Sequence, residues 1–148
     1  MRQIWHPWRA LRALTNVTLD RHDAAEEAHG WTEWSSPPRI TLREDLLQAE
    51  RRSTLTHELV HLERGPLAGE MVLDAREEET VEREAARRLI SLEQLVYALQ
   101  WSSNEHELAE DLWVDVAMIR ARFRALTPFE ERHIQRRLDQ VTHELEDE

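Results

Sequence analysis

Two histidines and a glutamate stand close together in the stretch TLTHELVHLERG, residues 54–65: His57, Glu58 and His61. Side chains four residues apart leave the same face of an α-helix, so both imidazoles can bind one metal ion. The H-E-x-x-H pattern is the one with which zinc peptidases hold their metal and activate water. The spacing therefore predicts a metal site, with Glu58 beside it as a candidate general base.

Composition offers a plainer explanation for the same motif. The chain has 8 His and 30 acidic residues among 148 residues, so H-E-x-x-H would arise by chance in roughly one such sequence in twenty. On this interpretation the motif lies on an ordinary surface helix. A third ligand elsewhere in the chain separates the two interpretations, because zinc sites use at least three protein ligands.

The residues around the motif predict the rigid helix that a metal site needs. Leucine and valine recur at helical intervals over residues 46–62, and neither Gly nor Pro occurs over residues 39–64. Gly65 and Pro66 then form a C-terminal stop signal. The helix is expected to end one turn after the second histidine, so that both rings are held mid-helix.

The downstream segment EEETVEREAARRLI, residues 77–90, contains candidates for the third ligand. If this segment is helical, its apolar residues define one face, and Glu82 projects close to the middle of that face. A carboxylate aimed into an apolar face is costly unless it is paired, so a metal ion explains Glu82 well. Glu78 projects similarly but lies near the expected helix start, which makes it the reserve candidate, and Glu84 faces solvent.

The composition of the whole chain limits the classes of function. A formal net charge of −11 argues against a surface built for general binding of nucleic acid or membranes. The absence of cysteine excludes disulfides and thiolate metal sites and favours a reducing compartment. No apolar run approaches the roughly 20 residues of a membrane span, and no signal-peptide core follows the N-terminus. We therefore expect a cytoplasmic protein.

The pattern of strand-like and helical segments predicts an α+β fold. A small N-terminal sheet is expected to pack on the helix of the H-E-x-x-H motif, followed by a mostly helical C-terminal half. The expected elements are a short helix within residues 1–14, strands at 17–19, 30–34 and 39–42, and helices after residue 73 with breaks near 102–104 and 127–128. We expect one domain over residues 1–148, divided into a metal-site core over 1–100 and a helical subregion over 101–148.

Four stretches in this order, RITL, QAERRSTLTHELVHLERG, VEREAARRLI and ELAEDLWVDVAMIRARFRALT, resemble the ImmA/IrrE family of small metallopeptidases of bacteria and their mobile elements. The resemblance covers most of the chain and implies a zincin-like fold. The family's E-x-E-A element matches residues 82–85, and its first acidic residue is the family's third zinc ligand. Three features depart from the commoner pattern: Val60 replaces Gly, Ala86 replaces Asn or Asp, and the usual Leu-Leu-Met-Pro stretch is shortened to Leu89-Ile90-Ser91.

The resemblance implies a zinc ion bound by His57, His61 and Glu82. Glu58 would then take a proton from water and pass it to the leaving amine. A further donor is needed for the oxyanion. The candidates that stay open are His22, His29 and Tyr97. The strand over 39–42 is expected to offer an edge along which an extended peptide can pair.

Members of this family typically cleave a helix-turn-helix repressor of a phage, mobile element or stress circuit, so the resemblance implies such a protein as substrate. Residues 107–124 themselves have helix-turn-helix spacing, with arginines on the second helix, and DNA binding through this segment is a weaker alternative. Trp113 stands where Gly is usual in the turn, and acidic residues crowd the first helix, which favours a scaffold role. A second class of function is a non-catalytic, zinc-containing regulator that binds a repressor or DNA through its C-terminal helices.

Overall fold

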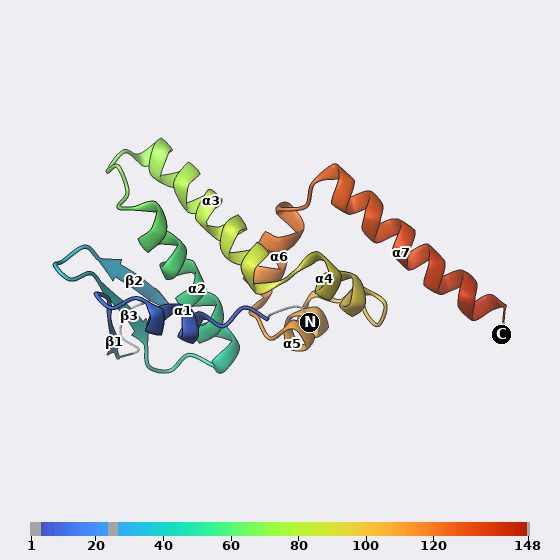
Figure 1. The fold of residues 1–148 in the computed structure, drawn as a ribbon, viewed down its shortest axis with the longest axis horizontal. Helices are drawn as coiled ribbons and strands as arrows, with labels where there is room; N and C mark the ends of the chain where they lie inside the picture. Colours follow the sequence, from blue (N-terminus) through green and yellow to red (C-terminus); the bar gives the residue numbers. More distant parts are fainter. Residues whose placement is uncertain (1–3, 24–26, 148) are drawn as a thin grey trace.

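The computed structural model describes residues 4–23 and 27–147. The elements are α1 (Pro7–Ala13), β1 (Thr18–His22), β2 (Gly30–Glu33), β3 (Arg39–Arg43), α2 (Gln48–Arg64), α3 (Met71–Leu89), α4 (Leu92–Leu99), α5 (Glu105–Leu112), α6 (Val116–Arg124) and α7 (Pro128–Glu146). Figure 1 shows the sheet and α1 at one end of the molecule and α7 reaching outward at the other. This order confirms the predicted α+β class.

Most predicted elements occur close to their expected positions. The helix expected within residues 1–14 is α1, although residues 1–3 lie outside the described part of the chain. All three strands are present within a few residues of their predicted bounds, and the helical half breaks near residues 102–104 and 127–128 as expected. Local signals were sufficient here because each break coincides with a helix-capping residue, Asn104 or Thr127, whose side chain accepts backbone N–H groups.

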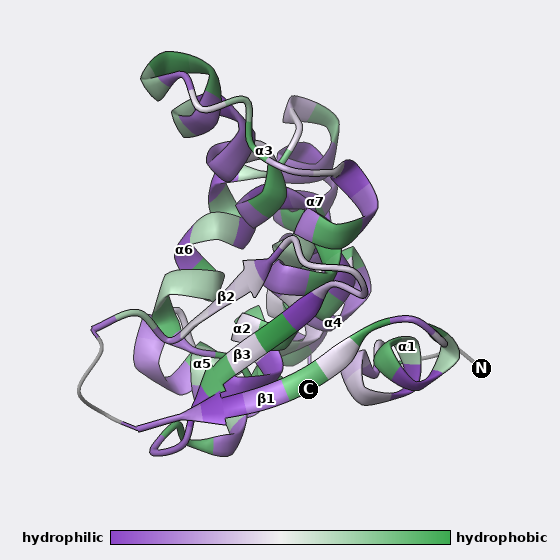
Figure 2. Ribbon diagram, turned by 90° about the vertical axis from the view of Figure 1, so that its left-hand side faces the viewer, coloured by the Kyte–Doolittle hydropathy of each residue, from purple (hydrophilic) through white to green (hydrophobic). Residues whose placement is uncertain are grey.

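The sheet has the order β1-β3-β2, with β3 parallel to β1 and antiparallel to β2. Figure 2 shows β3 lying between its two neighbours. The prediction that residues 39–42 form a free edge is therefore wrong, and the edge beside α2 belongs to β2. The physical reason is burial: Ile40 and Leu42 are 0% and 3% exposed, which suits a strand paired on both sides.

Helix α2 is buried between the sheet and the other helices. Leu55 and Leu59 pack with Ile40 of β3 in one apolar cluster, while Val60 belongs to a second cluster among the helices. Trp5 contacts both clusters and donates its indole N–H to Thr56 Oγ1 at 2.9 Å. The helix that carries the H-E-x-x-H motif is thus held from two sides.

Both ends of α2 are set by local interactions. The Glu50 carboxylate accepts a hydrogen bond from the Leu47 backbone N–H at 2.8 Å, which satisfies one of the free amides at the start of the helix. At the other end Gly65 adopts φ 98°, a conformation that favours glycine, and its N–H donates to His61 O at 2.9 Å. The predicted stop signal after the motif is confirmed.

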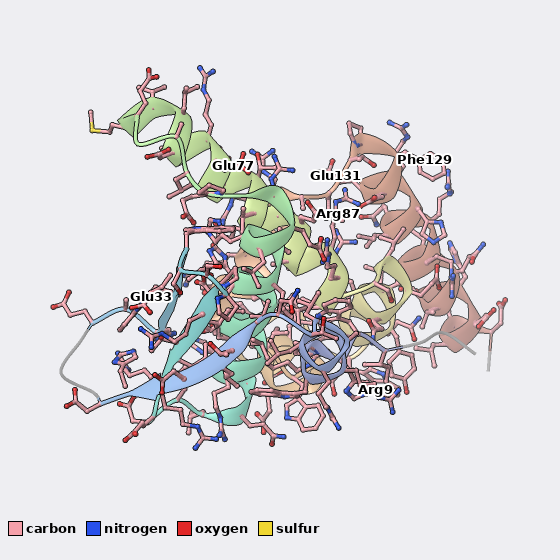
Figure 3. All side chains as sticks on the ribbon, turned by 60° about the vertical axis from the view of Figure 1, so that its left-hand side comes forward. Arg9, Glu33, Glu77, Arg87, Phe129 and Glu131 are labelled. Carbon is pink, nitrogen blue, oxygen red and sulfur yellow. The ribbon has the colours of Figure 1, made fainter. Side chains whose placement is uncertain are left out.

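Helix α3 packs along α2, and arginines tie it to neighbouring elements. Arg88 donates to both carboxylate oxygens of Glu63 on α2. Arg87 donates to Glu130 Oε1 at 3.0 Å and to Ala125 O, which links α3 to the start of α7. Figure 3 shows Arg87 beside the first turn of α7, where Glu131 is labelled. These contacts fix the position of α3 relative to the motif helix.

The turn between α5 and α6 is anchored to α2 one turn before His57. Arg52 donates to the carbonyls of Leu112 and Trp113, and Ser53 Oγ accepts the Asp115 N–H at 3.3 Å. Trp113 has φ 62°, the left-handed conformation that usually selects Gly in this position. The helix-turn-helix spacing of the sequence therefore corresponds to a real pair of helices, whose turn is fixed to the helix that carries the H-E-x-x-H motif.

The arginines of α6 are engaged within the molecule. Arg122 is 2% exposed and donates to Ile90 O at 2.8 Å. Arg120 binds Glu105 through two hydrogen bonds, and Arg124 binds Glu82 at 3.0 Å. These side chains stabilise the packing of α6 on its neighbours.

Replacing Arg122 by Ala should lower the free energy of unfolding by about 2–4 kcal/mol, because the change leaves the buried carbonyl of Ile90 without its donor and opens a cavity. Urea denaturation followed by circular dichroism measures this loss. Arg120→Ala is the matched control, since its exposed ion pair contributes less than about 1 kcal/mol. Equal effects of the two substitutions would contradict a structural role for Arg122.

Within residues 4–23 and 27–147, no helix combines the length and the apolar character needed to cross a membrane.

Candidate metal centre

Two helices bring three potential metal ligands together. His57 and His61 on α2 direct their Nε2 atoms at one carboxylate, that of Glu78 on α3, over distances of 3.2 and 3.0 Å. Potential ligand atoms of all three residues lie within 4.8 Å of one another, and among the described residues this is the group that could hold a metal ion. Two imidazole nitrogens and one carboxylate oxygen form a ligand set that suits zinc.

Glu82, the residue that the sequence favoured as third ligand, is placed differently. Its carboxylate lies 3.0 Å from Arg124 Nη2 and is not part of the group formed by His57, His61 and Glu78. It does border the same cleft, close enough for its charge to act on His57. Glu78, the reserve candidate, is therefore the carboxylate that faces both histidines in this structure, and Glu82 as third ligand stays a prediction.

The difference between the two glutamates has a simple physical cause. The sequence places Glu78 near the expected start of a helix, whereas α3 begins at Met71, so Glu78 is an interior residue of the helix. Glu78 and Glu82 are one turn apart on the same face of α3, and helical periodicity cannot distinguish them.

Electrostatics favour a positive charge between the three side chains. Burial tends to lower the pKa of His57, but the hydrogen bond to Glu78 and the charges of Glu58, Glu78 and Glu82 outweigh it, and the pKa is raised. The pKa of Glu78 is lowered, mainly by its hydrogen bond with His57. A bound cation would take the place of the imidazole proton, so metal binding and protonation compete at this site.

Glu58 lies beside the three ligand candidates without joining them. Its side chain faces the sheet, is 6% exposed, and accepts a hydrogen bond from Thr32 Oγ1 of β2 at 2.6 Å. The position next to His57 fits a base that acts on water at the metal. Nothing in the sequence indicated Thr32, because its partner is 26 residues away and belongs to a different element.

A cleft borders the ligand candidates and follows β2. It consists of two hollows of about 230 and 280 Å³ that share Gly30, His57 and Glu58. One hollow continues towards α6, and its other lining residues are His29, Ser53, Thr54, Glu82, Asp115, Ala117 and Met118. The second continues towards the α2–α3 connection, and its other lining residues are Trp31, Thr32, Trp34, His61, Leu67 and Glu78. The cleft thus runs past the three ligand candidates along the edge strand.

Gly30 is required where β2 passes closest to α2. A Cβ atom at this position would lie 2.8 Å from the Thr41 carbonyl oxygen and 2.9 Å from Thr54 Cγ2. Both atoms belong to packed elements, so the backbone would have to move. Gly30→Ala should therefore lower the free energy of unfolding by about 1–3 kcal/mol. Thermal denaturation tests this, and an unchanged midpoint would show that the strand moves away from α2 at little cost.

The three candidate donors for the oxyanion are separated in space. His29 lines the cleft together with His57 and Glu58. His22 stacks on Trp31 with ring centroids 4.4 Å apart, and both its ring nitrogens are buried. Of the three, His29 is the one that borders the same hollow as the ligand candidates.

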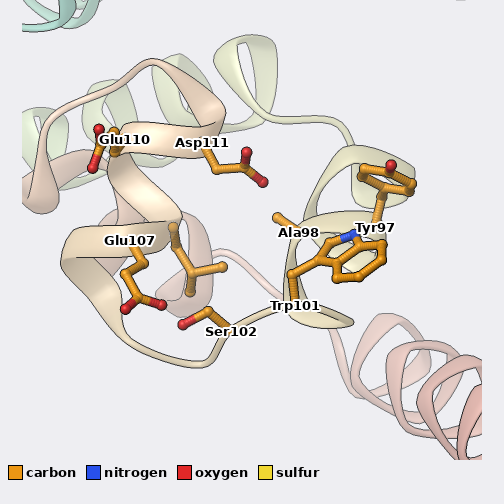
Figure 4. A pocket seen from close by; sticks show the side chains of 8 residues that line it. Tyr97, Ala98, Trp101, Ser102, Glu107, Glu110 and Asp111 are labelled. Atoms are coloured by element: carbon orange, nitrogen blue, oxygen red, sulfur yellow. The ribbon is translucent and has the colours of Figure 1, made fainter.

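Tyr97 belongs to a different part of the molecule. It lines a cavity of about 600 Å³ between α4 and α5 together with Trp101. Figure 4 shows these two rings on one side and the carboxylates of Glu107, Glu110 and Asp111 on the other. This cavity contains none of the ligand candidates, so its size does not identify the reactive site.

A buried helix with two histidines one turn apart, an adjacent glutamate, a facing carboxylate and an edge strand along the cleft together define a metallopeptidase-type site. The family model for the IrrE N-terminal-like domain, of the M78 peptidases, matches residues 16–133. This match covers most of the chain, which therefore belongs to the IrrE N-terminal-like (M78 peptidase) family. Comparisons with curated proteins and with solved structures gave no significant match.

Proposed function

We propose that this protein is a zinc-dependent endopeptidase that cleaves a regulatory protein, with a helix-turn-helix repressor as the leading substrate class. The observation that carries the proposal is the convergence of His57 and His61 Nε2 on the Glu78 carboxylate, with the buried Glu58 beside them in a cleft. Family membership supports peptidase chemistry. The repressor follows from the typical substrates of the ImmA/IrrE family.

Zinc would be held by His57, His61 and Glu78. When bound, it lowers the pKa of a water molecule and polarises the carbonyl of the peptide bond. The absence of cysteine leaves nitrogen and oxygen ligands only, which is consistent with a zinc site of the His-His-Glu type.

The protein's own residues then perform the proton transfers. Glu58 accepts a proton from the attacking water as the new C–O bond forms, and it delivers this proton to the amide nitrogen as the C–N bond breaks. His29, at the border of the cleft, is the candidate donor to the oxyanion. The products are a carboxylate and an amine, with one water consumed.

The free edge of β2 is the proposed binding site for the substrate backbone. Among the residues that the structure describes, β2 pairs with β3 alone, and its residues line the cleft past His57. An extended peptide can add to such an edge through main-chain hydrogen bonds, while side-chain pockets provide selectivity. The flanking rings of Trp31 and Trp34 supply apolar surface in one hollow.

The surface charge supports a protein partner over DNA. The net charge is −11, and the three arginines of α6 are engaged with Glu105, Ile90 O and Glu82. A repressor presents a basic DNA-binding surface, which complements an acidic protein in long-range attraction. Binding of DNA through residues 107–124 is the weaker alternative.

The test mixes the zinc-loaded protein with the helix-turn-helix repressor encoded nearest to its gene and follows the reaction by intact mass. A single cut made by the wild type, and not by Glu58→Gln, establishes the peptidase and its substrate class. An intact repressor that nevertheless forms a stable complex would indicate a non-catalytic regulator. Salt-sensitive binding to promoter DNA without cleavage would favour the DNA alternative.

A further inference from the structure

The side chain of Glu58 makes a short hydrogen bond with the edge strand. Thr32 Oγ1 donates to Glu58 Oε2 at 2.6 Å, within the range of strong bonds to a carboxylate. In residues 4–23 and 27–147, no other side chain forms a hydrogen bond or ion pair with the Glu58 carboxylate. The geometry of this group is therefore controlled by one hydroxyl.

Thr32 itself is held by the sheet. It lies opposite Ile40 in the antiparallel ladder between β2 and β3, and Ile40 is 0% exposed. A donor on a paired strand keeps its position better than one on a loop, because the ladder fixes its backbone. The hydrogen bond to this fixed strand consequently restricts the movement of the Glu58 carboxylate on α2.

We propose that Thr32 is a positioning residue for the general base, an inference that rests on the proposed peptidase function. The hydroxyl donates a hydrogen bond to Oε2, which occupies one lone pair of this oxygen and makes it less basic than Oε1. Oε1 is then the favoured acceptor for the proton of the attacking water. The carboxylate then stays in one orientation, with Oε1 available to the water, through both proton transfers.

The two transfers are simplest when one oxygen performs both. A proton that arrived on Oε2 would weaken the hydrogen bond from Thr32, because such a bond is strongest to an ionised oxygen. Misorientation of a catalytic group by a fraction of an ångström lowers the rate of the chemical step without necessarily weakening substrate binding. Removing the hydroxyl should therefore reduce kcat and leave KM nearly unchanged.

Strand β2 thereby has two roles. Its free backbone edge is the proposed binding site for the substrate, and its Thr32 side chain positions Glu58, the base that acts on the same substrate. The alternation of side chains along a strand lets one residue point to α2 while the backbone groups remain at the edge. The distance between the scissile bond and Glu58 of α2 is then set through one strand, which contacts both.

The experiment compares zinc-loaded wild type, Thr32→Val and Thr32→Ser on a peptide that spans the repressor cut. Thr32→Val keeps the shape and removes the hydroxyl, so kcat should fall about 10- to 100-fold, with KM within about twofold. Thr32→Ser restores the hydroxyl and should recover most of kcat. Thr18→Val, an exposed threonine of β1, is the matched control and should behave as wild type. Zinc content and thermal midpoint are measured for each protein.

A second measurement does not depend on turnover. The ¹³C resonance of the Glu58 side-chain carboxyl, identified by its absence in Glu58→Gln, should shift in Thr32→Val and return towards the wild-type position in Thr32→Ser. In the Glu58→Gln background, Thr32→Val should add no further loss to the residual rate, because the hydroxyl acts through the carboxylate.

These experiments distinguish the positioning role of Thr32 from the proposed peptidase function. Normal kcat in Thr32→Val, or a low kcat that Ser does not recover, overturns the positioning role while wild-type cleavage upholds the peptidase. An unshifted carboxyl resonance in Thr32→Val overturns the role as well. No cleavage by the zinc-loaded wild type overturns the proposed function and this inference together.

Discussion

Glu58→Gln should keep its zinc and lose its peptidase activity. Gln preserves the size of the side chain and can still accept the Thr32 hydroxyl, but it cannot take a proton from the attacking water. General-base catalysis contributes about 10²- to 10⁴-fold to such reactions, so kcat should fall by at least about a hundredfold. Cleavage measured by intact mass, beside zinc measured by plasma emission spectrometry, provides both readouts.

The matched control for this substitution is Glu79→Gln, an exposed residue of α3 whose carboxylate pairs with Arg83. It makes the same chemical change away from the cleft and should leave kcat and zinc content unchanged. Full activity in Glu58→Gln would refute the assignment of the general base. Loss of zinc together with activity would instead mean that Glu58 belongs to the metal's immediate environment.

Glu78→Gln should lower zinc affinity strongly, whereas Glu82→Gln should not. Glu78 oxygens lie 3.2 and 3.0 Å from the two histidine Nε2 atoms, so its amide would be a poor substitute for a charged ligand. Even residues outside the ligand shell change metal affinity by about 10- to 100-fold, so removal of a ligand should exceed about a hundredfold. Competition with a chromophoric chelator at fixed pH measures the affinities, and His61→Ala serves as the reference for a lost ligand.

Glu82→Gln is the matched partner, one turn further along the same helix. The substitution removes the negative charge of Glu82, which breaks the ion pair with Arg124 and should leave zinc bound. A larger loss of affinity in Glu82→Gln than in Glu78→Gln would contradict the geometry described above. It would show that Glu82 leaves Arg124 and takes the ligating position when zinc binds, as the sequence resemblance implied.

The motif helix was predictable because everything that defines it is local. The i,i+4 spacing of His57 and His61, the absence of Gly and Pro before them, and Gly65 after them act within a few residues of one another. The α+β class was predictable for the same reason, since strand-like and helical segments differ in the spacing of their apolar residues. The structure places these elements where the sequence indicated, within a few residues.

What the sequence determined by itself is therefore the pair of histidines, their helix and Glu58 beside them. The tertiary structure decided the rest: Glu78 as the facing carboxylate, β2 as the edge strand, and Thr32 as the partner of Glu58. Helical periodicity places Glu78 and Glu82, one turn apart, on the same face of α3. Only the position of α3 against α2 decides which of them faces the histidines. Strand order and side-chain partners across elements are likewise long-range properties, set by how separate segments pack together.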